Sequence, residues 1–179
     1  MEAEKSAPAN VAANRHVLFL GRFTQEKGVH LLAEAAKAAN VPVRFVGDGP
    51  MAAEIARINP QAEIRPWVAA DKVFDEIWQA RAMVLPSIWF EPGPLVVAEA
   101  RSVGVPMILA RTTGPAGWLG PEEQPLIVEP ESVADLTRAL RFSQDDIALG
   151  KIGRAAFANY WGDPLTVQRH VAWTMKMYE

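Results

Sequence analysis

The chain has 179 residues, of which 50% are hydrophobic and 22% are charged, and its formal net charge is −3. This length is enough for one domain with a sizeable core, and the composition is that of an ordinary soluble globular protein. The charge balance excludes a strongly basic surface for nucleic acid or anionic membranes, and the absence of cysteine excludes disulfides and thiolate metal sites.

Residues 1–14 are small and polar and lack the hydrophobic segment of a secretory signal. We expect them to form a flexible tail or the remnant of a linker. No apolar run in the chain approaches the roughly 18 residues of a membrane-spanning helix. The expected location is therefore cytoplasmic.

From residue 15 onward, short apolar runs alternate with longer amphipathic segments whose apolar residues recur every three or four positions. Two of the amphipathic segments carry N-terminal helix signals, Pro50 at a first position and Ser132 at a cap. In chain order, the pattern predicts a strand at 16–20, a helix at 29–39, a strand at 43–47, a helix at 50–58, a strand at 62–68, a helix at 72–81, a strand at 82–87, a helix at 94–103, strands at 106–110 and 126–128, a helix at 133–142 and a final helix at 163–176.

Strands separated by helices at this spacing indicate βαβ units and a parallel sheet. The strands are continuous apolar runs, which is typical of a sheet covered on both faces. We therefore predict an α/β fold, with a single Rossmann-like domain over residues 15–179 and about six parallel strands. Such sheets bind ligands at the carboxyl ends of their strands, so the loops that follow strands are the first candidates for a site.

The loop "GRFTQEKG" at 21–28 follows the first predicted strand and leads directly into a helix. Its Arg22 and Lys27 would lie near a helix N-terminus, where free amides and the helix dipole also favour an anion. Gly21 and Gly28 would let the backbone bend sharply. An anion site and an ordinary solvated loop are both compatible with this segment. It is neither a Walker A loop nor the Gly-x-Gly-x-x-Gly motif.

The segment "WFEPGPLVVAEA" at 89–100 places Glu91 in a loop and Glu99 inside a helix. Glu99 lies about 200° around the helix from Arg101. If Arg101 faces water, Glu99 faces inward or into a cleft, where ligand hydroxyls would be suitable partners for its carboxylate. The alternative is a partly exposed Glu99 at the flank of the helix.

The same helix lacks Ser, Thr, Asp or Asn at its cap, so a bound phosphate could satisfy the amides of Leu95 and Val96. There is no Asp-x-Asp motif and no cluster of carboxylates or histidines that would hold Mg²⁺ or Zn²⁺. We therefore expect no metal site and no cofactor. The charge of a bound diphosphate would be met by Arg22, Lys27 and backbone amides.

Three segments, "GRFTQEKG", "FVGDGP" and "LPSIWFEPGPLVVAEARSVGVPMILA", occur in the order typical of one family. They resemble the C-terminal domain of retaining glycosyltransferases of the GT-B fold, the large group 1 family, or family four. The resemblance covers roughly residues 16–142. It implies a donor site for a nucleotide diphosphate sugar, whose nucleobase and sugar the motifs do not identify.

The resemblance assigns a role to each matching residue. It implies that Arg22 and Lys27 grip the donor diphosphate, that Glu91 meets hydroxyls of the donor sugar, and that Glu99 binds the ribose. Arg22, Lys27 and Glu91 would be the catalytic residues. The full donor-binding set that it implies, including the phosphate-binding amides of the helix and the segment near the base, is Gly21, Arg22, Lys27, Trp67, Val68, Glu91, Gly93, Leu95, Val96 and Glu99.

Two departures from the family pattern matter. Where the family usually has Glu-Gly-Phe-Gly-Leu or Glu-Pro-Phe-Gly-Leu, this chain has Glu91-Pro92-Gly93-Pro94-Leu95, and Pro94 has no amide to offer a phosphate. The chain also has room for only one of the two Rossmann-like domains of a GT-B enzyme. The implied partner is a missing N-terminal Rossmann domain, in the same parent chain or in a separate subunit. Nucleic acid is not an expected partner. Any peripheral membrane association is expected through the missing half only.

We therefore predict the donor-binding half of a metal-independent retaining glycosyltransferase, nearly inactive on its own, whose last helix crosses back to the missing domain. Two alternatives stay open. One is a non-catalytic nucleotide-sugar binding module or subunit. The other is a different sheet-based nucleotide binder, either half of a GT-B-like sugar epimerase or a dehydrogenase domain. The absent Gly-x-Gly-x-x-Gly motif argues against the dehydrogenase.

Overall fold

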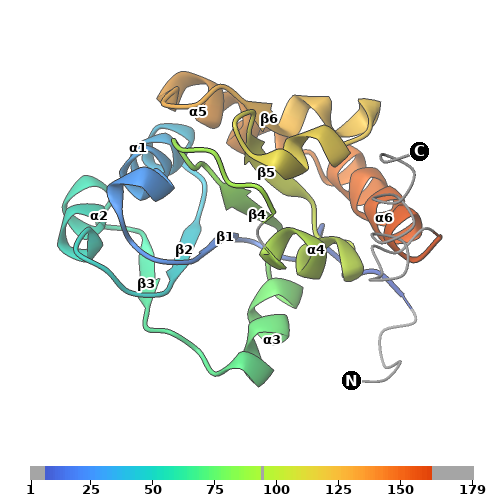
Figure 1. The fold of residues 1–179 in the computed structure, drawn as a ribbon, viewed down its shortest axis with the longest axis horizontal. Helices are drawn as coiled ribbons and strands as arrows, with labels where there is room; N and C mark the ends of the chain where they lie inside the picture. Colours follow the sequence, from blue (N-terminus) through green and yellow to red (C-terminus); the bar gives the residue numbers. More distant parts are fainter. Residues whose placement is uncertain (1–6, 94, 163–179) are drawn as a thin grey trace, which may run out of the picture.

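A computed structural model describes residues 7–93 and 95–162 of the chain. Its centre is a six-stranded sheet in the order β3-β2-β1-β4-β5-β6 (Figure 1). Every neighbouring pair of strands is parallel. This confirms the predicted parallel sheet of about six strands. The strands are β1 Val17–Leu20, β2 Val43–Val46, β3 Glu63–Arg65, β4 Ala82–Leu85, β5 Met107–Ala110 and β6 Ile127–Val128.

Helices cover both faces of the sheet, as predicted (Figure 1). One face carries α1 Val29–Ala39, α2 Ala52–Ile58 and α5 Val133–Phe142, and the other carries α3 Val73–Trp78 and α4 Leu95–Ser102. Helix α6 Asp146–Gly162 packs beside α4 and contributes to the clusters of both faces, through Leu149 and Ile152. Four 3-10 helices lie in the connections: η1 Gln25–Lys27, η2 Ala70–Lys72, η3 Gly114–Trp118 and η4 Pro121–Leu126.

Strand β1 shows why the strands read as continuous apolar runs. Val17 and Phe19 point into the cluster under α1, whereas Leu18 points into the cluster under α4, and all three are fully buried. Successive side chains in a strand point to opposite faces, so a strand such as β1 that is covered on both faces is apolar on both. The rings of Phe19, Phe23 and Phe45 pack together with centroids 5.8–6.2 Å apart.

Two predicted helix boundaries can be compared with the structure. The side chain of Ser132 accepts a hydrogen bond from the Asp135 amide at 3.1 Å, which confirms the cap of α5. Helix α2 begins at Ala52 with Met51 at the cap, so Pro50 precedes the helix and is not its first residue. The final helix predicted at 163–176 lies outside the described residues.

Helix α6 was not predicted from the sequence. Gly150 and Gly153 lower its helix propensity. Its buried positions, Leu149, Ile152, Gly153 and Ala156, include two small residues and leave only a weak apolar stripe. The helix is stabilised by packing beside α4, which a sequence pattern does not reveal.

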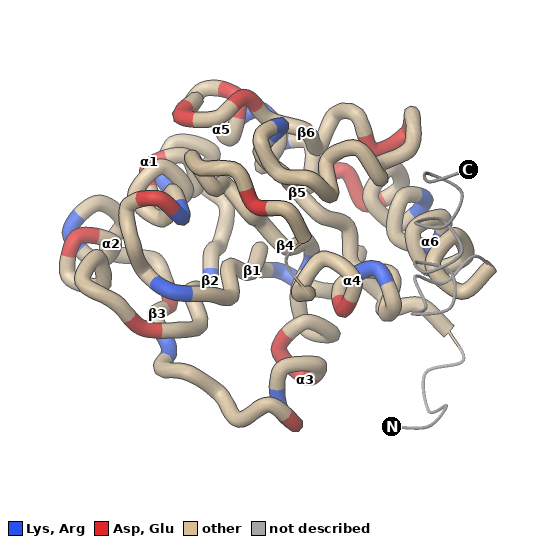
Figure 2. Tube along the Cα trace, in the orientation of Figure 1, with Lys and Arg blue, Asp and Glu red and all other residues tan. Residues whose placement is uncertain are grey.

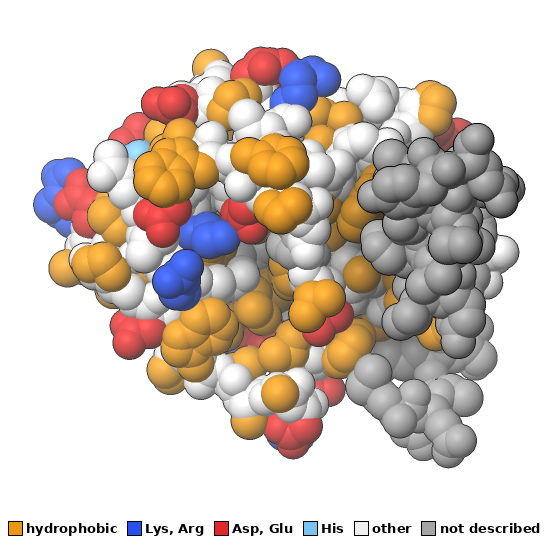
Figure 3. All heavy atoms as spheres, in the orientation of Figure 1, with side chains coloured by type: hydrophobic (Ala, Val, Ile, Leu, Met, Phe, Trp, Pro, Cys, Tyr) orange, Lys and Arg blue, Asp and Glu red, His pale blue; other side chains and the backbone are white. Residues whose placement is uncertain are grey.

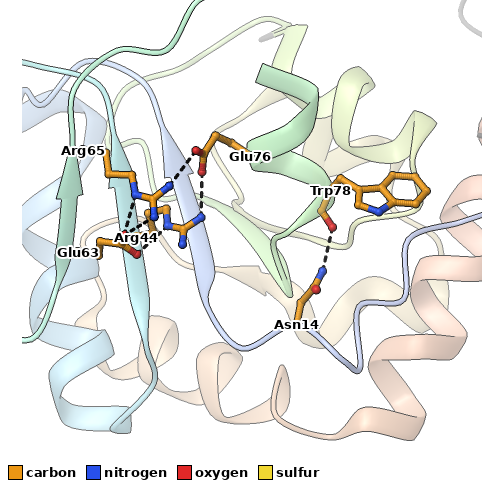
Figure 4. A network of polar contacts seen from close by, with 6 residues as sticks. All are labelled: Asn14, Arg44, Glu63, Arg65, Glu76 and Trp78. Atoms are coloured by element: carbon orange, nitrogen blue, oxygen red, sulfur yellow. Dashed lines mark hydrogen bonds and ion pairs between the residues drawn. The ribbon is translucent and has the colours of Figure 1, made fainter. Parts of the chain in front are cut away.

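The described part of residues 1–14 differs from the expected mobile tail. Ala9 and Val11 are buried, and the Ala9 amide donates to the Val103 carbonyl at 2.8 Å. The Asn14 amide group donates to the Trp78 carbonyl at 2.9 Å (Figure 4). It also donates to the Ala80 carbonyl at 2.9 Å. These residues pack against the core, so the flexible-tail prediction is wrong for residues 9–14.

A network of charged side chains joins β2, β3 and α3 (Figure 4). Arg44 pairs with Glu63 at 2.7 Å and with Glu76 at 3.0 Å, and Arg65 pairs with the same two carboxylates at 2.6 and 3.1 Å. Burial, aided by the nearby Arg44, lowers the pKa of His16 to about 4. The network therefore balances two cations with two anions at the edge of the sheet next to a neutral histidine.

Candidate functional site

Strands β1 and β4 are neighbours in the sheet, but the chain leaves them toward opposite faces, into α1 and α4 respectively. This is a topological switch point, where open α/β sheets form a ligand crevice at the carboxyl ends of the strands. The loop at 21–28 and the loop at 86–93 both emerge there (Figure 1). Both acidic and basic residues lie along the loops at the carboxyl ends of the strands (Figure 2). The molecular surface seen from the same direction carries charged and hydrophobic side chains together (Figure 3).

Two of the predicted site residues meet across these loops. The Lys27 ammonium nitrogen lies 2.9 Å from Oε1 of Glu91. Gly28 follows with a φ of 67°, and a Cβ added there would lie 2.2 Å from the Pro86 carbonyl oxygen. Only glycine fits this conformation and this contact, so Gly28 lets the two loops touch. Gly21, in contrast, is not in the left-handed region, and nothing in its backbone conformation requires glycine.

Arg22 is exposed in the same loop and makes no hydrogen bond or ion pair with another described residue. Nearby, a hydrogen bond from the Thr24 hydroxyl lowers the pKa of Glu26, and the charge of Arg22 adds to this effect. The Ile88 amide donates to the Glu26 carbonyl at 2.8 Å, which ties the first loop to the second. Arg22 is thus a cation available to an external anion.

Glu91 has contacts that the sequence did not indicate. The buried Ser87 donates its hydroxyl to Oε1 of Glu91, and the Gly114 amide donates to the Glu91 carbonyl at 2.8 Å. Ser87 is part of the Leu-Pro-Ser segment that carried the family resemblance, but it was not a predicted site residue. The only sequence signal was this polar residue at the end of an apolar strand.

Glu99 is half-buried on α4, and no described residue makes a hydrogen bond or ion pair with its carboxylate. Burial raises the pKa of this carboxyl. Arg101 does not face water, because it is buried and pairs with the buried Glu123 of η4 at 2.7 Å, so the condition on which Glu99 would face inward is not met. A half-buried carboxylate without a protein partner is still an acceptor suited to ligand hydroxyls.

The remaining predicted positions lie around the same edge. Helix α4 begins at Leu95, so the amides of Leu95 and Val96 belong to a first turn that lacks intrahelical acceptors. Trp67 is half-exposed and Val68 partly buried in the segment after β3, two strands away from β1. A Cβ on Gly93 would touch nothing within 4 Å, so space does not require glycine at that position.

In the part of the chain that the structure describes, no group of three or more histidine, aspartate and glutamate side chains is arranged to hold a metal ion. Over the same residues, no helix combines the length and the apolar character needed to cross a membrane.

Comparison with known proteins identifies the family. A family model for "Glycosyl transferases group 1" matches residues 2–156. The putative teichuronic acid biosynthesis glycosyltransferase of Bacillus subtilis is 29% identical over 143 residues, which cover 74% of this chain and 34% of that protein. The chain therefore spans about a third of the length of this curated relative.

Solved structures share the fold. Anabaena HepE, in complex with UDP and glucose, superposes with a TM-score of 0.75 at 20% identity, over 93% of this chain and 49% of that one. The C-terminal domain of a group 1 family glycosyl transferase from Francisella tularensis superposes with a TM-score of 0.73 at 17% identity, over 89% of both chains. The family match, with this fold, shows that the chain belongs to the group 1 glycosyl transferases and is built like the C-terminal domain of their GT-B architecture.

Proposed function

We propose that this chain is the donor-binding half of a retaining glycosyltransferase, which moves a sugar from a nucleotide diphosphate sugar to an acceptor hydroxyl. One observation carries the proposal. At the carboxyl edge of the neighbouring strands β1 and β4, the loop after β1 carries the cations Arg22 and Lys27, and α4, which follows β4, carries a first turn of free amides and Glu99, whose carboxylate has no partner among the described residues. A nucleoside diphosphate needs this combination of positive charge, free amides and acceptors for hydroxyls.

Each group has a physical role in this proposal. Arg22, Lys27 and the amides of Leu95 and Val96 stabilise the charge that develops on the leaving diphosphate. Glu91 accepts hydrogen bonds from hydroxyls of the transferred sugar, and the resemblance gives Glu99 the ribose in the same way.

The segment with Trp67 and Val68 follows β3 and would lie by the base. Because the cations and amides meet the diphosphate charge, we propose that no divalent metal is needed. Retention of configuration follows from the family resemblance.

The relatives support a division of labour. HepE was solved with UDP and glucose, and this chain covers 49% of that protein. We propose that the acceptor site lies on an N-terminal Rossmann domain, in the same parent chain or in a separate subunit, and that the isolated chain transfers no sugar. A cytoplasmic location remains a prediction.

The experiment is a thermal-shift and calorimetric screen of the 179-residue chain against UDP, GDP and ADP, each with and without EDTA. A ligand at a hundred times its Kd should stabilise the fold by about 2.7 kcal/mol. We expect one nucleotide to do so, and we expect EDTA to leave the effect unchanged. Absence of a shift with all three would refute donor binding, and a shift abolished by EDTA would refute metal independence.

A non-catalytic nucleotide-sugar module would use the same crevice, and so would half of a GT-B-like epimerase. Both would bind the nucleotide as the transferase does. Joining the chain to its N-terminal domain separates them, since only a transferase would then release nucleoside diphosphate in proportion to an acceptor hydroxyl consumed.

A further inference from the structure

We propose that Ser87 is a positioning residue for Glu91. In this view, Ser87 and Lys27 hold one carboxylate oxygen of Glu91 so that the other oxygen is presented to a hydroxyl of the donor sugar. This inference rests on the proposed function and deepens it, because it explains how the sugar part of the donor is read.

The contacts of Glu91 are unequal between its two oxygens. Oε1 accepts from the Ser87 hydroxyl and lies 2.9 Å from the Lys27 ammonium nitrogen. Oε2 accepts no hydrogen bond from a described residue, and the side chain is 17% exposed. An ionised carboxylate has acceptor capacity on both oxygens. One oxygen is therefore used by the protein, and the other is available in the crevice.

Ser87 is itself firmly held. It is 1% exposed, so its hydroxyl lies away from bulk solvent, and Glu91 is the acceptor that the structure provides. The Thr112 hydroxyl donates to the Ser87 carbonyl at 3.1 Å, which links the end of β4 to the loop after β5. A buried hydroxyl with one charged acceptor orients that acceptor, because breaking the bond would leave both groups poorly satisfied.

The backbone of Glu91 is fixed from the same side. The Gly114 amide donates to the Glu91 carbonyl at 2.8 Å, and Glu91 forms an isolated parallel bridge with Thr113. A Cβ on Gly114 would lie 2.4 Å from the Pro92 carbonyl oxygen, so the loop after β5 touches the backbone here. With the main chain and one oxygen both fixed, the remaining oxygen is pre-organised for a ligand.

When a donor is bound, Lys27 would divide its hydrogen bonds between Glu91 and the diphosphate. Its ammonium group has three donors and can serve Glu91 and a diphosphate together. As Lys27 turns toward the diphosphate, the neutral Ser87 hydroxyl keeps Glu91 in place. Loss of Ser87 should therefore weaken recognition of the sugar and leave recognition of the diphosphate intact.

The test uses the 179-residue chain and calorimetric Kd values for paired ligands: UDP and UDP-glucose, GDP and GDP-mannose, ADP and ADP-glucose. For the pair that binds, the ratio of the two Kd values measures what the sugar adds. Ser87→Ala should reduce this sugar contribution roughly tenfold, the order of one charge-assisted hydrogen bond. The Kd of the nucleoside diphosphate should stay unchanged, and Ser87→Thr, which keeps a hydroxyl, should restore much of the contribution.

A second comparison separates positioning from a general structural effect. If Ser87 acts through Glu91, Ser87→Ala should have no further effect on the sugar contribution in a Glu91→Ala background. Ser87→Cys, which has nearly the same size, replaces Ser87→Ala should the latter not fold. Three outcomes would overturn the role of Ser87. Ser87→Ala could weaken binding of the nucleoside diphosphate and of its sugar conjugate equally, it could leave the sugar contribution unchanged, or its effect could add to that of Glu91→Ala. Failure of the unmodified chain to bind any nucleotide would instead overturn the proposed function on which it rests.

Discussion

At the scale of single residues, Lys27 stands between two partners. Its nitrogen contacts Glu91 at 2.9 Å, and the same side chain borders the crevice in which we place the diphosphate. Arg22 has no such partner among the described residues, so the two cations differ: Lys27 is oriented by Glu91, and Arg22 is available to a ligand. Both would act mainly on a charged ligand, because an uncharged nucleoside gains little from either.

Lys27→Ala should weaken nucleoside diphosphate binding by about tenfold or more, since it removes a charge-assisted hydrogen bond. Binding of the nucleoside alone should change much less. The matched control is Lys72→Ala. Lys72 is an exposed lysine of η2 that pairs with Asp75 of α3, and its loss should leave both affinities unaltered. Equal loss for nucleoside and diphosphate, measured by calorimetry, would contradict the assignment of Lys27 to the diphosphate.

Ionisation of Glu99 should lower the stability of the fold and favour the binding of ligand hydroxyls. Burial raises the pKa of this carboxyl above its usual value of 4.5, so in the folded chain the proton is held more tightly than in the unfolded chain. Stability must then fall as the pH rises from about 4.5 through the higher folded value. The charged form is the less stable form of the folded protein, and it is the form with the greater acceptor capacity for hydroxyls.

Glu99→Gln should therefore raise the melting temperature at pH 7, with a smaller gain at pH 4, and should weaken nucleotide and nucleoside binding alike. Glu34→Gln, at an exposed position of α1, is the control and should show neither effect. Thermal unfolding across this pH range provides the measurement. A melting temperature lowered by Glu99→Gln at pH 7, or unaltered affinity, would mean that Glu99 is only a flank residue of the helix.

At the scale of elements, the site depends on two loops that meet because β1 and β4 are adjacent. Gly28 is the contact point, with its φ of 67° and the Pro86 carbonyl where a Cβ would be. The loop after β5 adds a third support through Gly114. These contacts join residues that are far apart in the sequence, and a shift of any one loop would move Lys27 relative to Glu91.

Gly28→Ala should lower the melting temperature and weaken nucleotide binding together, because its Cβ would be strained in conformation and would clash with backbone. Gly93→Ala is the matched control on the opposite loop. A Cβ there meets nothing within 4 Å, so its stability should stay the same. A stable Gly28→Ala variant with full affinity would show that the close approach of the loops is not needed.

At the scale of the whole molecule, the sequence predicted what depends on local pattern. Short apolar runs located most of the strands, although β3 is Glu63-Ile64-Arg65, and helix α1 has the predicted bounds of 29–39 because its apolar spacing is strong. Helix α6 was missed because its buried face contains glycine and alanine. The packing of residues 9–14 was missed for a similar reason, since only Ala9 and Val11 are apolar anchors.

In the candidate site, too, features that follow local sequence pattern were predicted, whereas contacts that depend on tertiary packing were not. Residue types, positions after strands, helix geometry and the family resemblance together selected Arg22, Lys27, Glu91 and Glu99. The contact of Ser87 with Glu91 and the burial of Arg101 were not predictable, because each depends on a partner from another element. Sequence patterns report periodicity along the chain, whereas these contacts arise from how the sheet and its loops are placed in space.

The chain spans 34% of the length of its Bacillus relative, so the activity that we propose for the isolated chain is donor binding and not sugar transfer. The most direct measurement is calorimetric titration of the 179-residue chain with UDP, GDP and ADP and with their sugar conjugates, with Lys27→Ala alongside. We expect one nucleotide to bind, its sugar conjugate to bind more tightly, and Lys27→Ala to weaken both. Binding of none of these ligands, or binding that Lys27→Ala leaves unchanged, would contradict it.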